Sequence, residues 1–274
     1  MSAKRRRAAQ ADIAQHLPLL VRDNATTNAR MWVYVGDDGY PYNVFDFTLN
    51  RGRDGPKYFL KDYRQVLLAD AYGGYNGVVA GNEITRAGCW AHLKRKVIDA
   101  EKAAPEIARE AVERVRALYA VERQCKDASV EERLKLRRQQ SAPLLAQLRE
   151  RLLTWKEQLL PKHPMAEAIN YALGQWVELN VFCSDGAVSI DNNVSEREMK
   201  RVVLNRKNSL FVGNPRGGRT AAILASLTST CRRHDIDPQL YLTQLLTNLS
   251  QVRKGELPNW LPDQWKRIQA ARLP

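Results

Sequence analysis

The sequence predicts an α/β fold in which strands give way to helices along the chain. Three observations lead to this prediction. Before about residue 92, segments alternate apolar and polar residues or form short apolar runs, as strands do. Over about 93–180 the apolar residues recur at helical spacing, and helical signals return over 221–252. We therefore expect a mixed sheet flanked by helices, interrupted by an all-α insertion and followed by a helical C-terminal tail.

The charge of the chain favours a polyanionic partner. The 274 residues include 43 Lys and Arg against 30 Asp and Glu, which gives a formal net charge of +13. Nucleic acid is the first candidate for such a partner, and an acidic membrane surface is the weaker one. The hydrophobic share of 44% is enough for a real core.

The cysteines and the hydrophobic pattern indicate a cytoplasmic protein. The four cysteines lie far apart without a Cys-x-x-Cys pair, so neither a zinc knuckle nor a disulfide framework is predicted. The sequence contains no run of about 18 apolar residues, and no apolar signal-peptide segment follows its basic start. We expect neither export nor a membrane-spanning helix.

The first part of the chain is expected to form a loosely ordered segment and then a hairpin. Residues 1–28 are basic at first and then mixed, the polar stretch 22–28 is typical of a loop, and we expect little order there. Met31–Val35 and Asn43–Thr48 have the composition of strands, and Gly36–Gly39 is a turn signal between them. A short helix is expected over Gly55–Arg64.

A buried strand that ends on an acid is the first feature that suggests chemistry. Val66–Ala69 is a compact apolar run, Asp70 follows it, and a glycine-rich turn comes next. This pattern predicts a strand that delivers a carboxylate to one edge of a sheet. Taken alone, such an aspartate is more often a turn or cap residue than a metal ligand. Ile84–Trp90 is expected to form a further strand.

Helical periodicity predicts an all-α insertion over 93–164. A coiled-coil dimerisation arm is the alternative, but four prolines divide the region into pieces that are too short for one. These prolines are Pro105, Pro143, Pro161 and Pro164. Beyond the insertion, Met165–Leu179 is expected to form one more amphipathic helix.

The excess positive charge is concentrated on and after a helix that carries Glu196. Asp191-Asn192-Asn193 supplies capping residues for this helix, and basic residues outnumber acidic ones between 196 and 219. The Asp-Asn-Asn segment and Glu196 each also have an ordinary structural interpretation. The Asp-Asn-Asn segment alone reads as a helix cap, and Glu196 with Lys200 reads as a surface pair four residues apart.

Two further motifs have competing interpretations. Cys89-Trp-Ala-His92 could be part of a metal site, but the sequence has no second close pair of ligands, so packed Cys and Trp side chains are the favoured reading. Gly217-Gly218 could let the backbone approach a phosphate, although a flexible basic turn explains it equally well.

An acid that ends a buried strand and a second acid on a basic helix suit two-metal phosphoryl transfer. Carboxylates can hold Mg²⁺ or Mn²⁺ ions about 3.5–4 Å apart. The sugar-phosphate backbone is the matching substrate, since Arg197, Lys200 and Arg201 lie within about one helical turn of Glu196 and could clamp phosphates. Spacing alone does not decide between this chemistry and the structural readings.

Several segments follow one another in an order that is typical of one family. These segments are Leu68–Tyr75, Cys89–His92, Leu160–Lys162, Ser189–Arg197, Arg206–Gly213 and Gly217-Gly218. With them the chain resembles the transposases of the bacterial insertion-sequence family sixty-six, a DDE group with an RNase H-like catalytic core. A segment near Cys231 and Asp237–Leu242 is similar to the C-terminal part of that family, so the resemblance covers about residues 30–265.

The resemblance implies cleavage and joining of DNA strands at insertion-sequence ends with Mg²⁺ or Mn²⁺. Asp70 would be the second acid of the triad and Glu196 the last, both as catalytic metal ligands. The partner would be double-stranded DNA, at transposon ends and target, bound by a homo-oligomer with accessory proteins of the element. Phosphate contacts of this kind make affinity strongly salt-dependent. The DNA-binding residues would be Arg197, Lys200, Arg201, Arg206 and Lys207.

The resemblance also suggests how the chain divides. The expected parts are a basic, poorly ordered N-terminal segment (1–28), the first part of an RNase H-like core (29–92), a helical insertion (93–164), the second part of the core with the Glu helix (165–222), and a C-terminal helical segment (223–274).

The sequence departs from the family at its first acid. Similar members place that acid in an Asp-Glu-Thr-Pro or Asp-Asp-Thr-Pro segment, whereas here Gln15-His-Leu17 precedes Pro18. Asp12 is the nearest carboxylate, three residues early, and is not expected to replace the missing acid. We therefore expect a truncated or frameshifted copy. The alternatives are a catalytically incomplete remnant that only binds DNA and a related nuclease of the same core fold.

Overall fold

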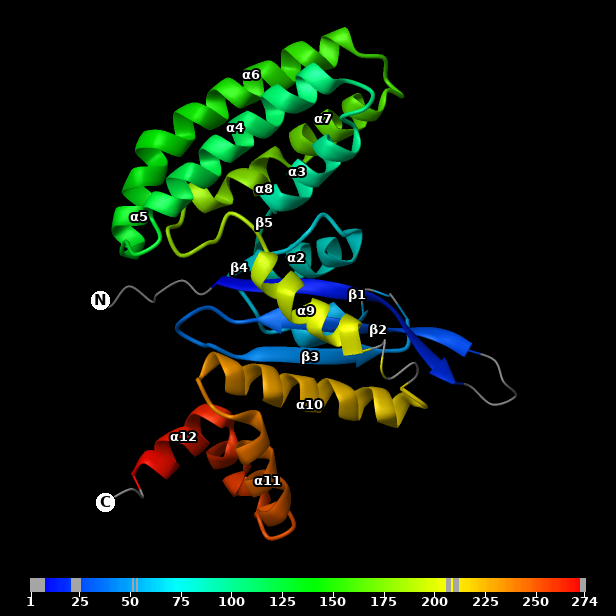
Figure 1. Cartoon of the computed structure of the whole chain (residues 1–274), viewed down its shortest axis with the longest axis vertical. Helices are drawn as coiled ribbons and strands as arrows, with labels where there is room; N and C mark the ends of the chain where they lie inside the picture. The colour runs from blue at the N-terminus through cyan, green and yellow to red at the C-terminus, as the bar shows by residue number, and fades with distance from the viewer. Residues whose placement is uncertain are drawn as a thin grey trace. The chain divides into compact units, whose positions relative to one another are not determined.

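The structure is an α/β chain made mostly of helices, as the sequence predicted (Figure 1). The chain forms two compact units, and each is described by itself. One unit contains Phe59–Asn193, and the other combines Ala9–Tyr58 with Val194–Pro274. The computed structural model describes residues 8–20, 26–50, 52, 54–205, 208 and 212–271.

The first unit begins with a pair of short parallel strands and continues with helices (Figure 1). Leu67 pairs with Arg86 at the centre of the two strands. The strand predicted to precede Asp70 is confirmed, whereas the next one is shorter than predicted because a helix begins at Trp90. The elements in chain order are β4 (Val66–Leu68), η1 (Gly73–Tyr75), α2 (Asn76–Asn82), β5 (Thr85–Ala87), α3 (Trp90–Asp99), α4 (Pro105–Gln124), α5 (Val130–Leu136), η2 (Arg137–Ser141), α6 (Ala142–Gln158), α7 (Pro164–Gly174), α8 (Trp176–Asn180) and η3 (Val181–Cys183).

Helices α3, α4 and α6 share one apolar core with α7, and α3 to α6 together are here called the helical block. Helices α4 and α6 pack side by side in this block (Figure 1). The helical spacing of the apolar residues gives the helices of the core one buried stripe each, which on α4 includes Val115 and Leu118. Trp90, Leu148 and Leu118 are among the largest fully buried side chains of the chain. Burial of such stripes is the main favourable term in the stability of helices that would be marginal in isolation.

Pro143 does not divide the helical block, contrary to the expectation from sequence. Elements α5, η2 and α6 follow one another without a gap from Val130 to Gln158. η2 is a π-helical turn, in which the Ala142 backbone N–H donates to the Arg137 carbonyl five residues earlier. A proline ring clashes with the carbonyl four residues before it in a regular α-helix. The widened turn directly before Pro143 changes that spacing, so the helix continues.

The region Met165–Leu179 is helical as predicted, but it forms two helices where one was expected. Helix α7 ends at Gly174, and α8 begins at Trp176. Glycine at the end of a helix is common because it lowers the cost of leaving the helical conformation. The break lets Leu179 and Phe182 join the core of the unit from a different direction.

The second unit contains an antiparallel sheet in which β2 lies between β1 and β3 (Figure 1). Trp32 pairs with Asp46 on β3, which confirms the predicted hairpin. Strand β1 lies within the segment that was expected to have little order, and for Ala8–Leu20 that expectation is wrong. Its backbone pairs with β2, an interaction that needs no apolar pattern of its own. The elements are β1 (Ala8–Leu20), β2 (Thr26–Val35), β3 (Asn43–Thr48), α1 (Asp54–Phe59), α9 (Asn193–Asn205), α10 (Pro215–Arg233), α11 (Pro238–Asn248), η4 (Lys254–Trp260) and α12 (Pro262–Ala270).

Helix α10 covers strand β3 and satisfies part of its backbone. The Phe45 N–H donates to the Ser226 hydroxyl over 2.8 Å, and the Asn43 N–H donates to the Thr230 hydroxyl over 3.1 Å. Hydroxyl groups on one face of the helix therefore replace the partners that a further strand would supply. Covering a strand in this way protects it from pairing with another chain.

The C-terminal helices form a small apolar cluster of their own within the second unit. Tyr241 and Trp265 meet edge to face with ring centroids 5.6 Å apart, and Cys231 is buried beside them. Residues 257–260 belong to the 3-10 helix η4. Across the described residues, no helix is both long and apolar enough to cross a membrane.

Candidate functional site

Asp70 lies directly after β4, where the sequence placed it. The three residues of β4 are buried, and the Ala69 N–H continues the pairing by donating to the Ala87 carbonyl over 3.1 Å. Asp70 itself is half-buried. Its Oδ1 accepts the backbone N–H of Tyr72 over 3.1 Å, whereas its Oδ2 has no hydrogen-bond donor within the described part of the chain. One carboxylate oxygen thus supports the following turn, and the other is available to a ligand.

The charge of Asp70 affects a tyrosine on α7. The pKa of Tyr171 is raised to about 12, first because the phenol is buried and also because Cys89 and Asp70 disfavour a second negative charge. Arg86 on β5 acts in the opposite direction. The ammonium group of Lys96 lies 4.9 Å from the centre of the Tyr171 ring. Asp70 therefore lies in a partly buried environment that also contains cations.

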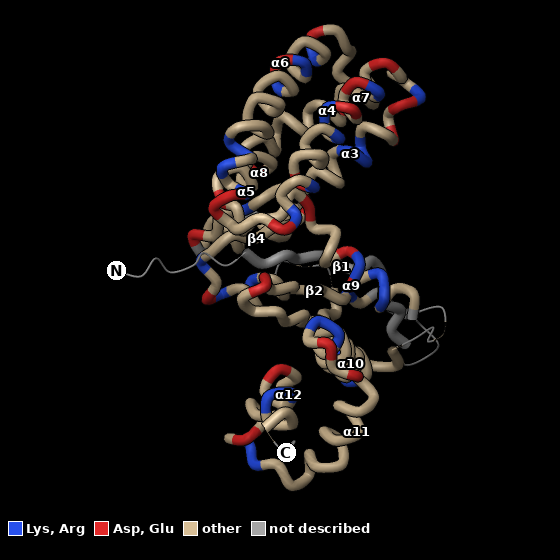
Figure 2. The backbone as a smooth tube through the Cα atoms, turned by 60° about the vertical axis from the view of Figure 1, so that its left-hand side comes forward, with Lys and Arg blue, Asp and Glu red and all other residues tan. Residues whose placement is uncertain are grey.

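Glu196 lies in the first turn of α9. Ser195 and Met199 are buried on one side of this helix, and Glu196 is half-buried. An acid in the first turn interacts favourably with the positive end of the helix dipole. The basic residues predicted to bind DNA, Arg197, Lys200 and Arg201, are exposed on the same helix, and Figure 2 shows acidic and basic positions alternating along it.

Arg201 is not a free cation, since its Nε lies 3.4 Å from Glu198 Oε1. The other oxygen of Glu198 accepts the Ser229 hydroxyl over 2.5 Å. Glu198 therefore links α9 to α10 and has a structural role in the second unit. Arg206 and Lys207, the remaining predicted DNA contacts, lie outside the described residues.

Asp70 belongs to the first unit and Glu196 to the second, so each is described only within its own unit. Among the described side chains, no group of three or more His, Cys, Asp and Glu is close enough to hold one metal ion. A metal site that joins the two acids stays a prediction from sequence.

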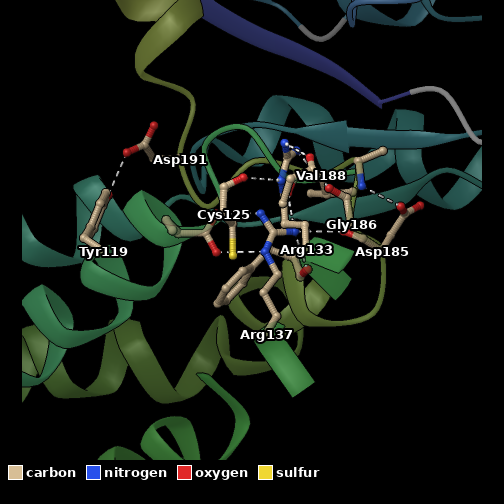
Figure 3. Close-up of polar contacts among 12 residues, drawn as sticks. Tyr119, Cys125, Arg133, Arg137, Asp185, Gly186, Val188 and Asp191 are labelled. Atoms are coloured by element: carbon tan, nitrogen blue, oxygen red, sulfur yellow. Dashed lines mark hydrogen bonds and ion pairs between the residues drawn. The ribbon is translucent and has the colours of Figure 1, made fainter. Parts of the chain in front are cut away.

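The loop before α9 is tied to the helical block through Asp191. The Tyr119 hydroxyl on α4 donates to Asp191 Oδ2 over 2.7 Å (Figure 3). The side-chain amide of Asn193 donates to the same oxygen over 2.7 Å, and its backbone N–H donates to Oδ1 over 3.1 Å. Asp191 thus supports the start of α9, as its cap-like sequence suggested. Burial and the nearby Asp191 carboxylate both raise the pKa of Tyr119, so it stays a hydrogen-bond donor at neutral pH.

A buried arginine holds the earlier part of the same loop (Figure 3). The guanidinium of Arg137 forms a bidentate pair with Glu122 on α4, with distances of 2.8 and 2.6 Å. Its NH1 donates to the backbone carbonyls of Phe182, Asp185 and Val188 at 2.8, 3.0 and 2.9 Å. The Arg137 side chain is only 1% exposed, so these bonds are made away from water.

Arg133 adds a further bond from the helical block to the loop. Its NH1 donates to the Gly186 carbonyl over 3.2 Å, and its other nitrogens donate to carbonyls of Cys125 and Ala128 (Figure 3). No sequence pattern indicates these contacts, because arginines on a charged helix normally lie in solvent. In the structure, a π-helical turn that starts at Arg137 accompanies these contacts. The amino-acid pattern does not indicate this turn.

The two ambiguous motifs have structural roles. Cys89 is 1% exposed, and the Trp90 indole N–H donates to the Leu179 carbonyl over 2.7 Å, so the packed reading of this motif is confirmed. Gly217 and Gly218 lie in the first turn of α10. A Cβ on Gly218 would come within 2.4 Å of the Phe47 ring, so this glycine permits close packing of α10 on β3.

Comparison with known proteins gives the family. The model of the transposase IS66 family matches residues 14–220. The uncharacterized protein y4hP of Sinorhizobium fredii is 34% identical over 94% of this chain and 50% of its own length. The uncharacterized protein y4jD of the same organism is 34% identical over 90% of this chain and 51% of its own length. The chain belongs to the transposase IS66 family.

The chain spans about half the length of the curated relatives that it matches. Asp70 and Glu196 both fall within the range that matches the family model. The helical block and the loop that it holds fall within the same range.

Proposed function

We propose that this chain is the catalytic region of a DDE-type DNA transposase, which cleaves and joins DNA strands at insertion-sequence ends in a metal-dependent reaction. The observation that carries this proposal is the position of Asp70. A half-buried carboxylate follows a buried strand, has one oxygen available within the described residues, and lies in the part of the chain that matches the transposase family.

The proposal includes an RNase H-like core. It is supported by the antiparallel strands β1 to β3 in one unit and the parallel strands β4 and β5 in the other, which together give the strand types of a mixed sheet. In this proposal, the helical segment over 93–164 is an insertion between the first part of the core (29–92) and the second (165–222).

Asp70 and Glu196 are the residues that would hold Mg²⁺ or Mn²⁺. Carboxylate oxygens are the ligands that these ions prefer, and the available oxygen of Asp70 fits this role. When bound, such an ion would polarise a phosphoryl oxygen and promote formation of the attacking nucleophile. On the protein side, the exposed Arg197 and Lys200 would hold phosphates beside Glu196. Arg201, Arg206 and Lys207 complete the proposed DNA-binding set.

A DNA-binding remnant without catalytic activity is the second candidate. It is favoured by a specific feature of the sequence, namely that Gln15-His-Leu17 stands before Pro18 where the family resemblance places an acid. Asp12 pairs with Val33 in the register of β1 and β2, and it remains the nearest carboxylate in the sequence. In the remnant, the basic residues would still bind DNA, but the set of metal ligands would be incomplete.

The transposase and the DNA-binding remnant are expected to differ in the metal-dependent cleavage and joining of DNA strands. The chain is incubated with Mg²⁺ and a labelled duplex that carries an inverted repeat of its own element, and nicked and joined strands are measured. The transposase is expected to produce them, and Asp70→Asn and Glu196→Gln are each expected to abolish them. A wild-type chain that binds this duplex but never cuts it would identify the remnant.

Two matched variants test whether Asp70 and Glu196 are needed for cleavage beyond the negative charge that they carry. Asp62→Asn removes the same charge from an exposed residue of the first unit, and Glu198→Gln removes it from α9 while the amide oxygen can still accept the Ser229 hydroxyl. Both are expected to keep activity. Equal loss of activity in Glu196→Gln and Glu198→Gln would contradict the proposed role of Glu196.

A further inference from the structure

A cleft between α3 and α4 in the first unit has an unusual set of charges. Its volume is about 620 Å³, and its charged lining residues are all basic. We call it the basic cleft. It is lined by Ala91, Lys94, Arg95 and Ile98 from α3, by Arg116, Tyr119 and Arg123 from α4, and by Asn193.

The lining follows directly from helical spacing. The residues from α3 are three, four and seven positions after Ala91, and those from α4 are three and seven positions after Arg116. Residues with this spacing share one face of a helix. Each helix therefore turns one basic face toward the cleft, and Figure 2 marks basic positions on both helices.

Three of the four basic residues that line the cleft have no acidic partner in the described part of the chain. Lys94, Arg116 and Arg123 form no ion pair with any residue that the structure describes. Asp191, which contacts Tyr119 and Asn193 of the lining, already accepts hydrogen bonds from both residues. Glu122 on α4 is engaged in its bidentate pair with Arg137. Three cations that share a cleft without counter-charge favour an anionic ligand.

The spacing of the cations favours an extended anion over a single phosphate ion. Arg116 and Arg123 are seven residues apart on α4, which corresponds to about 10 Å along the helix axis. One DNA strand carries a phosphate about every 3.4 Å along the duplex axis, so the two arginines can reach different phosphates of one strand. Tyr119, which lies between these two arginines on α4, and Ile98 on α3 give the cleft an apolar part.

We infer that the basic cleft binds the phosphodiester backbone of DNA, so that the helical block itself contacts DNA. This inference rests on the proposed function for the identity of the ligand, but it goes further by adding a binding site remote in sequence from the basic residues of α9. Tyr119 lines the cleft and also holds Asp191. Occupation of the cleft and the position of the loop before α9 are therefore linked through one side chain.

The test measures DNA binding by the full chain without divalent metal, so that it does not depend on cleavage. Fluorescence anisotropy with a labelled duplex is recorded at several salt concentrations for wild type and for Arg116→Gln/Arg123→Gln. The affinity of the variant is expected to fall by about tenfold or more for each lost charged contact. The slope of log K against log salt concentration is expected to decrease by about 1.8, since each phosphate contact contributes about 0.9.

The matched control is Arg138→Gln/Arg149→Gln, which removes the same charge from exposed residues of the helical block outside the cleft. Thermal unfolding followed by circular dichroism verifies that both double variants fold. The control is expected to keep wild-type affinity and slope. Equal weakening in both variants would overturn the inference, because binding would then follow net charge alone.

The remaining outcomes separate this inference from the proposed function. A wild-type chain that fails to bind DNA at low salt would overturn both. Wild-type DNA affinity in the cleft variant, together with intact metal-dependent cleavage, would overturn only the inference. Titration with inorganic pyrophosphate tests whether the cleft binds a small anion that contains phosphate instead of DNA. Binding of pyrophosphate that the cleft variant loses while its DNA affinity is unchanged would identify a small-anion site and overturn the inference.

Discussion

The hydroxyl of Tyr119, in the middle of the helical block, donates a 2.7 Å hydrogen bond to Asp191, two residues before α9 begins. These residues are 72 positions apart in the sequence. Asp191 uses its remaining contacts to hold Asn193, so one carboxylate joins α4 to the first residue of the helix that carries Glu196. The helical block therefore supports the approach to that helix.

Loss of the Tyr119 hydroxyl is expected to weaken this support without disturbing the core. We predict that Tyr119→Phe lowers the free energy of unfolding by about 1.5 kcal/mol, the lower end of the range for a bond to a charged group, because water can replace the donor at the half-buried Asp191. Urea unfolding measures the change. Tyr171→Phe is the control, since the hydroxyl of Tyr171 has no hydrogen-bond partner among the described residues. If both variants lose the same stability, the bond to Asp191 does not contribute as proposed.

Replacement of Arg137 is expected to have a larger effect than any exposed charge in the block. Arg137→Met fills similar volume but leaves Glu122 without its partner and three loop carbonyls without their donor. Loss of one member of a buried ion pair costs about 3–5 kcal/mol of stability. Chemical denaturation should detect a decrease of this size. The neighbouring Arg138 is exposed, so Arg138→Met should stay within about 0.5 kcal/mol of wild type. A decrease below 1 kcal/mol for Arg137→Met would contradict the structural role of the buried guanidinium.

Stability should fall in alkaline solution partly because of Cys89. Burial raises the pKa of this thiol to about 11, from an ordinary value of about 9. Above pH 9 the unfolded chain loses the proton while the folded chain keeps it, so the free energy of unfolding decreases as the pH rises toward 11. The contribution of one such group is at most about 1.4 kcal/mol for each pH unit. Unfolding curves recorded between pH 8 and 10.5 give the slope.

The Cys89→Ala variant separates this contribution from that of other groups. It should lose stability at neutral pH because a buried side chain is shortened, but its stability should depend less steeply on pH above 9. Val97→Ala shortens a buried residue of α3 without removing a titrating group, so its slope should match that of the wild type. A wild-type slope in Cys89→Ala would show that this thiol does not titrate as described.

The pattern of apolar and polar residues was sufficient to predict those strands and turns that a few neighbouring residues determine. The hairpin of β2 and β3 and the buried strand before Asp70 follow from alternation and from a short apolar run. The same kind of pattern failed at Pro143, because the π-helical turn that accommodates the proline has no composition signal. It also failed for β1, whose order depends on backbone pairing with β2.

The candidate site could be predicted only in part for a similar reason. Asp70 and Glu196 were found because each stands next to a recognisable local element, a strand end and a capped helix. The contacts that Arg137 and Tyr119 make with the loop join residues 45 to 72 positions apart, and no local pattern indicates such pairs. The basic cleft was missed because its cations are mixed with acids in the sequence and separate from them only on the surfaces of folded helices.

Arg133 and Arg137 bind the loop through its main chain, which has a consequence for how this family can diverge. The acceptors are the carbonyl oxygens of Phe182, Asp185, Gly186 and Val188. A carbonyl group is present whatever side chain the residue carries. Substitutions in the loop can therefore accumulate while its path is retained, whereas one substitution at Arg137 releases several anchor points together. The same arrangement therefore tolerates changes of side chain in the loop and makes the loop depend on the arginine.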